Sequence, residues 1–158
     1  MEQLVQVVSF TLAGEEYGVE IGQVQEINRM IAITHVPRAP KFMEGVINLR
    51  GALIPIIDLR TRFGMERAEH TKNTRIVVTE IAAKRVGMVV DSVSEVLRIP
   101  QDQIEPPPEM LSGVGTEHIR GVGKMDERLI ILLDLARIIT AQEKDELLDA
   151  PTRELASV

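Results

Sequence analysis

The sequence predicts a mostly β protein made of two similar units packed side by side. Three observations support this fold class. Short runs of β-branched and apolar residues are separated by turn residues roughly every 8–12 positions, as in small barrels and sandwiches. Blocks of the sequence recur later in the chain. The 158 residues include three Phe, one Tyr and no Trp, so the core must be aliphatic.

The internal repeat consists of two blocks with different offsets. An offset of 76 (121 − 45) relates Gly45-Val46, Leu53-Ile54 and Asp58-Leu59 to Gly121-Val122, Leu129-Ile130 and Asp134-Leu135. Upstream, an offset of 69 (87 − 18) relates Gly18, Val24, Glu26 and Arg29 to Gly87, Val93, Glu95 and Arg98. Chance similarity between β-rich segments rarely produces two ordered blocks. We therefore expect two copies of one β unit, at about residues 16–63 and 84–139.

The first elements are expected to be strands. Val5–Leu12 is rich in β-branched residues, and Tyr17–Glu20 returns as its partner after a turn. The segment Ile21–Ile27 is ambiguous. Its apolar spacing of three fits one helical turn, whereas Val24–Ile27 fits the start of a strand equally well.

A tight hairpin is expected after a loop that contains Pro37 and Pro40. Its two apolar strands, Val46–Leu49 and Ala52–Leu59, meet at Arg50-Gly51. The later elements alternate between hairpins, loops and helices. In order, we expect a short helix at Leu59–Phe63 ending at Gly64, a loop at 65–73, a hairpin of Thr74–Ile81 and Arg85–Val90, a strand at Ser94–Ile99, a loop from Pro106 to Thr116, a hairpin of Ile119–Met125 and Arg128–Leu135, and a helix at Ala136–Leu148.

The composition excludes several classes of function. The net charge of −6 argues against a nucleic-acid binder, which needs basic patches and stacking aromatics. The chain has no Cys, so it has no disulfide, thiolate nucleophile or cysteine metal site. No apolar run approaches the roughly 18 residues of a membrane span, and the first residues do not resemble a signal peptide. We expect a cytoplasmic protein without a cofactor.

Few residues are candidates for catalysis. His35, His70 and His118 have no partner at metal-ligand spacing, and no motif of a nucleophilic enzyme is present. Asp58 and Asp134 each follow an apolar strand and precede a helix-like segment, which is the position of an N-cap. The alternative to capping is an acid–base role, which would make the chain a small ligand-binding β-barrel or a minor hydrolase.

Arg50 is the best candidate for recognition. Its planar guanidinium suits a carboxylate or a pair of carbonyl groups, and a hairpin does not need an arginine at its turn. The equivalent position in the repeat is Asp126, so the two copies diverge here. The competing interpretation is an exposed turn arginine that has no partner.

Several blocks of the chain closely resemble the family of the chemotaxis coupling protein CheW. The most specific block is Glu44–Gly51, E-G-V-I-N-L-R-G. The resemblance covers roughly Val5 to Leu148 and would leave 149–158 as a tail outside a single domain, 5–148. The other matching blocks, in order, are Phe10–Leu12, Glu16–Val19, Val24–Ile27, Pro55–Leu59, Arg85–Val93 and Ile119–Gly121.

This resemblance implies a fold of two five-stranded, SH3-like barrels on a shared hydrophobic core, with a C-terminal helix. It implies a bacterial adaptor without catalysis, metal or cofactor. Such an adaptor links the cytoplasmic tip of chemoreceptors, the methyl-accepting chemotaxis proteins, to the regulatory domain of the histidine kinase CheA. The receptor's helical hairpin would occupy an apolar groove between the subdomains, and the kinase would pack against a barrel end.

The resemblance also implies two sets of contact residues. The receptor set is Val24, Glu26, Gly45, Arg50 and Val96. The kinase set is Gly51, Thr74 and Ile76. Arg75 departs from the family pattern, because an aliphatic residue is common at that position.

Overall fold

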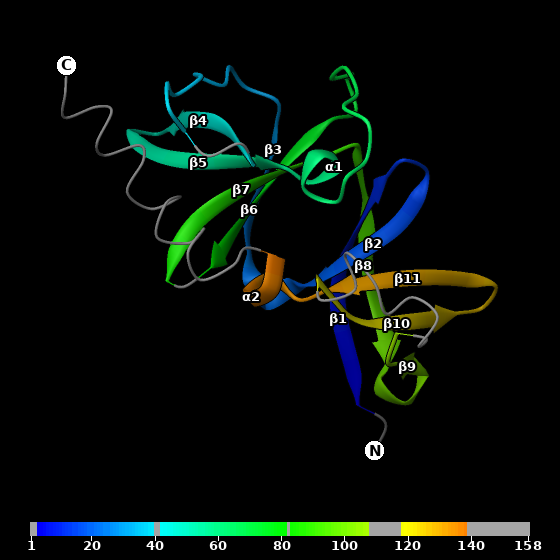
Figure 1. The fold of residues 1–158 in the computed structure, drawn as a ribbon. Helices are drawn as coiled ribbons and strands as arrows, with labels where there is room; N and C mark the ends of the chain where they lie inside the picture. The colour runs from blue at the N-terminus through cyan, green and yellow to red at the C-terminus, as the bar shows by residue number, and fades with distance from the viewer. Residues whose placement is uncertain (1–2, 40–41, 82, 108–117, 139–158) are drawn as a thin grey trace.

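The computed structural model describes residues 3–39, 42–81, 83–107 and 118–138. These residues form two β-sheets with very little helix (Figure 1). The strands are β1 (Leu4–Leu12), β2 (Glu15–Glu20), β3 (Val24–Arg29), β4 (Met43–Leu49), β5 (Ala52–Asp58), β6 (Arg75–Ile81), β7 (Lys84–Val90), β8 (Ser92–Pro100), β9 (Ile104–Glu105), β10 (Ile119–Met125) and β11 (Arg128–Leu133).

The helical elements are short. They are the 3₁₀ turns η1 (Ile21–Gln23) and η2 (Gln101–Gln103) and the α-helices α1 (Leu59–Arg62) and α2 (Leu135–Ile138). The ambiguous segment after β2 is therefore a 3₁₀ turn followed by a strand. Most of the expected helix at Ala136–Leu148, most of the proline-containing loop and the expected tail lie outside the described residues.

The predicted mostly β class with two similar sheets is confirmed. One sheet has five strands in the order β3-β6-β7-β5-β4, and the other has six in the order β8-β1-β2-β11-β10-β9. The sixth strand, β9, has only two residues. Both sheets also contain one parallel pair, β5 with β7 and β11 with β2. No local sequence pattern predicts these parallel pairs, because each joins strands far apart in the chain.

The two sheets share one topology. The repeat offsets make β3 equivalent to β8, β6 to β1, β7 to β2, β5 to β11 and β4 to β10. With these equivalents, the order of the five-stranded sheet becomes β8-β1-β2-β11-β10, which is the order of the first five strands of the other sheet. Even the register shifts correspond. The shift between Met43 and Gly45 recurs between Ile119 and Gly121, at the offset of 76 (119 − 43). The repeat is therefore visible in backbone geometry as well as in sequence.

Neither sheet is made from one repeat alone. The five-stranded sheet takes β3, β4 and β5 from the first repeat, β6 from the segment between the repeats and β7 from the second. The six-stranded sheet takes β1 and β2 from the start of the chain and the rest from beyond residue 91. Within the described residues the chain passes between the sheets twice, at η1 and at Asp91, the single residue between β7 and β8.

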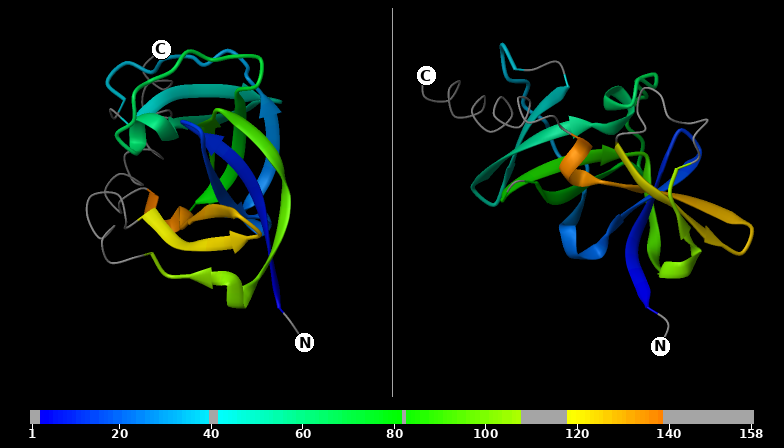
Figure 2. Two further views of the ribbon diagram at one scale, coloured as in Figure 1. Left: turned by 90° about the vertical axis from the view of Figure 1, so that its right-hand side faces the viewer. Right: turned by 60° about the horizontal axis from the view of Figure 1, so that its bottom comes forward.

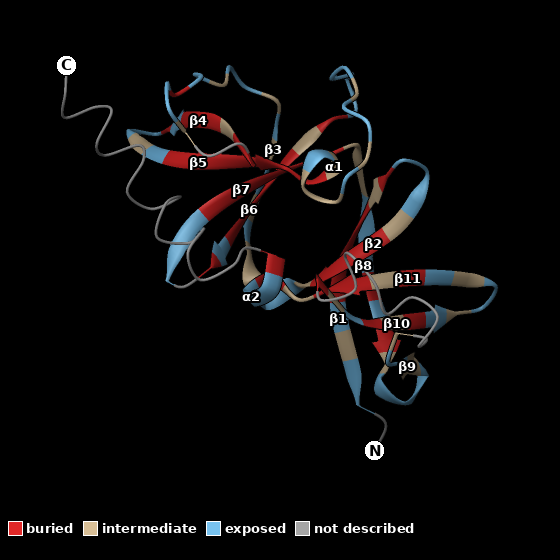
Figure 3. Cartoon of the chain, viewed as in Figure 1, coloured by how far each residue is buried: buried red, intermediate tan, exposed pale blue. Residues whose placement is uncertain are grey.

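The core has three parts, and the largest is the shared core expected between the two units. Two small clusters lie each within one sheet, and the largest cluster takes buried residues from both. In β6, Ile76 and Val78 belong to the small cluster of the five-stranded sheet, whereas Val77 belongs to the shared one. Strands buried on both faces in this way read as unbroken apolar runs. Figure 3 shows the buried segments converging where the sheets meet.

A row of rings crosses the shared core. Phe10 stacks on Tyr17 at 6.1 Å between ring centroids, Tyr17 on Phe63 at 6.0 Å, and Phe63 contacts His118 at 5.6 Å. The first two rings come from the six-stranded sheet, and Phe63 follows α1 of the five-stranded sheet. Burial is the main cause that raises the pKa of the Tyr17 hydroxyl.

Candidate functional site

The β4–β5 turn places Arg50 over the edge strand β3. Arg50 has a φ of 53° and Gly51 a φ of 87°, and the N–H of Gly51 donates to Oδ1 of Asn48 at 2.8 Å. The Arg50 guanidinium donates to Oε1 of Glu26 at 2.5 Å, and Asn28 donates to the other Glu26 oxygen. Since β3 and β4 are the two edges of the five-stranded sheet, this pair ties the edges together.

The interpretation of Arg50 as a turn residue without a partner is therefore wrong. Its hydrogen bond to Glu26 is the main cause that holds the pKa of that carboxyl below its ordinary value, and Asn28 adds to the effect. The Arg50 side chain is nevertheless 68% exposed. Glu26 uses one oxygen for each neighbour, while most of the arginine still faces solvent.

The other sheet holds a comparable charge pair. Arg128, at the start of β11, donates two hydrogen bonds to Glu16 at 2.6 and 3.1 Å and one to Glu95 at 3.2 Å. Glu95 is the repeat equivalent of Glu26. These contacts raise the pKa of Arg128 above its ordinary value. An arginine from a hairpin thus meets the edge-strand glutamate in both sheets, although it comes from different positions.

The remaining residues of the receptor set have unlike surroundings. Val24 is half-buried at the start of β3 and packs against the shared core. Val96 is 51% exposed on β8, the equivalent edge strand of the other sheet. Gly45 is buried, and a Cβ there would lie 2.4 Å from the carbonyl oxygen of Thr34. Gly45 thus permits a close backbone approach and presents no side chain to a partner.

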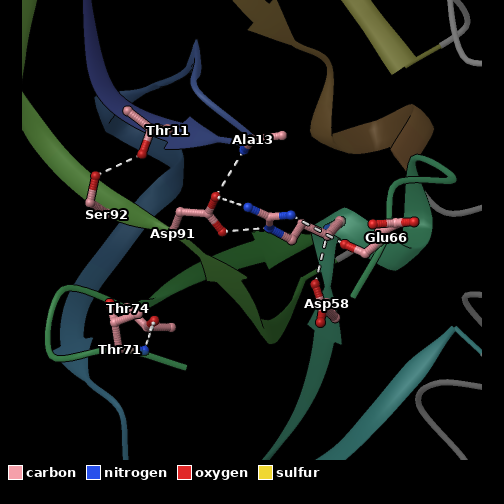
Figure 4. Close-up of polar contacts among 9 residues, drawn as sticks. Thr11, Ala13, Asp58, Glu66, Thr71, Thr74, Asp91 and Ser92 are labelled. Carbon is pink, nitrogen blue, oxygen red and sulfur yellow. Dashed lines mark hydrogen bonds and ion pairs between the residues drawn. The ribbon is translucent and has the colours of Figure 1, made fainter. Parts of the chain in front are cut away.

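The kinase set needs a correction. The Ile76 side chain is fully buried in the core of the five-stranded sheet, so it has no surface with which to contact a partner. Thr74 is also buried, and its hydroxyl accepts a hydrogen bond from the N–H of Thr71 at 2.8 Å (Figure 4). Gly51 alone of the three is exposed. Arg75 donates to the carbonyl oxygens of Lys72 and Thr74.

An exposed residue next to Gly51 was missed by sequence reasoning. Leu53 on β5 is 45% exposed, and its repeat equivalent, Leu129, is 62% exposed. In the sequence Leu53 lies inside an apolar run and looks like any core residue of that run. In β5, Leu53 is exposed and the five residues that follow are all buried, so nothing in the apolar run marks Leu53 as a surface residue.

The two aspartates that invited an acid–base interpretation are helix caps. Asp58 accepts from the N–H of Arg60 at 3.0 Å at the start of α1, and Asp134 accepts from the N–H of Ala136 at 3.1 Å at the start of α2. Both bonds satisfy backbone donors in the first turn of a helix. The predicted capping role is confirmed.

A hollow of about 770 Å³ lies outside both predicted contact sets. Its lining comes from the segment between β3 and β4, the start of β4, α1 and the loop after α1, and it includes His35, Phe42 and His70. The arginine of the lining, Arg67, is paired with Glu44. Among the described residues there is no group of three or more side chains that could hold a metal ion. No helix of the described part is long and apolar enough to cross a membrane.

Another arginine–carboxylate pair joins the two sheets at the β7–β8 crossover (Figure 4). Arg60 of α1 donates to both carboxylate oxygens of Asp91, at 2.8 and 2.6 Å. The N–H of Ala13, in the β1–β2 turn, donates to Oδ2 of Asp91 at 2.8 Å. The Arg60 hydrogen bonds are the main cause that keeps the pKa of Asp91 below its ordinary 3.8.

Replacing Asp91 by Asn is expected to lower the melting temperature at neutral pH and to matter less in acid. Because the native pKa of Asp91 is lowered, its charge stabilises the fold fully above the unfolded value of about 3.8. That stabilisation is lost as the pH falls through the native pKa. Thermal unfolding of both proteins from pH 7 downward should show the difference between their melting temperatures becoming smaller below about pH 4. A difference in melting temperature that does not change with pH would contradict this account.

Comparisons with known proteins cover most of the chain. The family model described as the CheW-like domain matches residues 6–143. The chemotaxis protein CheW of Klebsiella aerogenes is 41% identical over 134 residues, which cover 85% of this chain and 81% of that protein. The chemotaxis protein CheW of Helicobacter pylori is 36% identical over 138 residues, covering 87% of this chain and 83% of that protein.

A solved structure agrees with the sequence matches. The crystal structure of the scaffolding protein TtCheW from Thermoanaerobacter tengcongensis superposes with a TM-score of 0.82 at 38% identity. The match covers 89% of this chain and 96% of that one. The similarity therefore extends over both sheets of the fold.

Proposed function

The chain belongs to the CheW-like domain family, and from that membership we propose that it is a non-catalytic chemotaxis adaptor. It links the cytoplasmic tip of chemoreceptors to the regulatory domain of a CheA-type histidine kinase. It acts in the cytoplasm and reaches the membrane through its partners. The observation that carries this proposal is the match of fold and sequence to CheW proteins along nearly the whole chain.

The arrangement of polar side chains supports a binding role over catalysis. Asp58 and Asp134, the carboxylates considered for hydrolysis, are occupied in capping helices. The hollow beside the five-stranded sheet does not single out a ligand class, because its arginine is already paired. We propose one domain at 5–148 with two pseudo-repeated subdomains.

The receptor surface is proposed to lie on the two edge strands and the turn beside them. Val24 and Val96 are its apolar part, on β3 and β8. Glu26 and Arg50 are its polar anchors, already oriented toward each other. A helical hairpin laid on such a surface would use apolar contacts for affinity and the charged pair for register. Gly45 is proposed to act indirectly, by permitting the close approach of Thr34 to β4.

The kinase surface is proposed to lie at the β4–β5 turn. Arg50 and Gly51 are both exposed in this turn and Leu53 is exposed just after it; the kinase contact is proposed on Gly51 and Leu53. Thr74 and Ile76 are buried and are proposed to act only through the fold, by way of the loop before β6 and the core of the same sheet. Barrel-to-barrel packing favours small and apolar groups at the contact, and Gly51 and Leu53 supply them.

Opposite effects on the two partners are expected from two charge insertions. Val96→Glu should weaken binding of a receptor tip fragment at least tenfold, about 1.4 kcal/mol, and spare the kinase regulatory domain. Leu53→Glu should weaken binding of the kinase regulatory domain by a similar factor and leave receptor binding unchanged. Both sites are about half exposed, so folding should be preserved. Calorimetric titration of each variant against each isolated partner measures the four affinities.

Leu129→Glu is the matched control, because Leu129 is the repeat equivalent of Leu53 and is similarly exposed. It should change neither affinity. Loss of both partners by each variant, with folding intact by circular dichroism, would rule out two separate surfaces. Failure of the unmodified protein to bind either partner would refute the adaptor proposal itself.

A further inference from the structure

The duplicated fold provides an internal comparison for the ion pair between Arg60 and Asp91. The chain builds the same five-strand topology twice. At the equivalent positions of the other copy stand Ala136, at the offset of 76 (136 − 60), and Gly22, at the offset of 69 (91 − 22). Neither residue carries a charge. The sheet topology therefore forms without this pair, which implies a role beyond folding of the sheet.

The pair lies at one of the two crossovers between the sheets. Asp91 is the whole connection from β7 to β8. Its N–H donates to the carbonyl oxygen of Thr11 at 3.0 Å, and its carboxylate accepts from the N–H of Ala13. Both partners belong to the six-stranded sheet or its first turn. Next to it, the hydroxyls of Thr11 and Ser92 lie 2.7 Å apart.

Arg60 holds the same carboxylate from the five-stranded sheet. The backbone N–H of Arg60 is bound to the Asp58 cap, and its guanidinium also donates to the carbonyl oxygen of Glu66 at 3.2 Å. The other two guanidinium nitrogens each donate to one oxygen of Asp91. A two-pronged contact between a guanidinium and a carboxylate fixes direction as well as distance. Rotation of one sheet against the other would break it.

The other crossover has no comparable restraint at its equivalent position. There Gly22, in the 3₁₀ turn η1, has no side chain, and a Cβ built on it would meet nothing within 4 Å. Val24 begins β3 directly after this turn, and Val96 lies on β8, five residues after Asp91. The two apolar residues of the proposed receptor surface thus follow the two crossovers closely, one on each sheet.

We propose that Arg60 and Asp91 are positioning residues that set the angle between the two sheets, and through it the spacing of the receptor-contact residues on β3 and β8. The second half of this proposal rests on the proposed adaptor function. A helical hairpin that touches both edge strands needs them at one fixed separation. Neither Arg60 nor Asp91 has to contact the receptor for this effect.

The absence of cysteine allows a direct test by spin labelling of the full chain. Leu53→Cys and Leu129→Cys place one label on each sheet, and Ile27→Cys with Leu53→Cys places both on the five-stranded sheet. Pulsed electron–electron resonance measures the two distance distributions. Arg60→Gln should widen the inter-sheet distribution at least twofold and leave the distribution within the sheet unchanged.

Arg128→Gln is the matched control. Like Arg60→Gln, it removes an arginine that is paired with carboxylate. Its partners are Glu16 and Glu95, however, and all three residues belong to the six-stranded sheet. It should leave the inter-sheet distribution as narrow as in the parent protein. Without labels, Arg60→Gln should bind a receptor tip fragment about fivefold more weakly than Arg128→Gln does.

The outcomes separate the two parts of the inference. An unchanged inter-sheet distribution in Arg60→Gln overturns the positioning role. A widened distribution with receptor affinity equal to that of Arg128→Gln overturns the link to the receptor surface. If the parent protein does not bind the receptor fragment at all, the adaptor function fails, whereas the label distances still decide whether the pair sets the angle.

Discussion

Replacing Ile76 by Ala is expected to lower the free energy of unfolding by about 2–5 kcal/mol. The side chain is fully buried with Ile56 and Val89 in the core of the five-stranded sheet. Its Cγ2 also fills the space beside Gly87, where an added Cβ would lie only 2.9 Å away. Removing three carbons leaves a cavity that the surrounding strands close only in part. Urea unfolding followed by circular dichroism measures the change.

The same variant tests whether Ile76, being buried, makes no contact with the kinase. Under conditions where Ile76→Ala remains folded, its affinity for the kinase regulatory domain should stay within about twofold of the parent's. Leu53→Ala is the control in the same sheet. It should change stability by no more than about 0.5 kcal/mol, because the side chain is half exposed. A stable Ile76→Ala protein that no longer binds the kinase regulatory domain would show that Ile76 is a contact residue after all.

The second large effect is expected for Gly45→Ala, a loss of about 3 kcal/mol of unfolding free energy. The new Cβ would lie 2.4 Å from the carbonyl oxygen of Thr34 and 2.7 Å from Cγ2 of Ile33. Thr34 cannot withdraw freely, because its N–H and C=O are both hydrogen-bonded to Val46, at 2.8 and 2.9 Å. Thermal unfolding followed by circular dichroism measures the loss as a lower melting temperature.

Gly22→Ala is the matched control, since nothing lies within 4 Å of a Cβ at that position. Its melting temperature should equal that of the parent. For Gly45→Ala, receptor binding should fall only in proportion to the unfolded fraction. Full stability combined with lost receptor affinity would instead show that Gly45 contacts the receptor directly.

Most strands of this fold are predictable from local sequence, and the way they assemble is not. The hairpin of β4 and β5, the helix start at Asp58 and the turn at Asp126 follow from apolar runs, capping residues and turn residues. The parallel pairs join strands far apart in sequence, such as Ile56 with Gly87. No local pattern encodes such a pairing, so the mixing of the two repeats within each sheet was beyond sequence reasoning.

The candidate site was predictable to a similar degree. Arg50 and Glu26 were identified separately, and the structure shows that they are partners. Ile76 was misjudged because β6 is buried on both faces, so that its apolar run lacks the alternation which separates core from surface. The Arg60–Asp91 pair was missed because 31 residues separate its members and no local pattern links them.

The mixing of repeats also sets an order of assembly during synthesis. All five strands of the five-stranded sheet are present once Val90 has left the ribosome. The hairpin of β1 and β2 is made first, yet its neighbours β8 and β11 are among the later strands. Pairings this distant in the chain form slowly, because a long loop must close before they contribute. The outer edges of the β1–β2 hairpin therefore stay unpaired while the rest of the protein is translated. This makes the hairpin the segment of the nascent chain most exposed to misassociation.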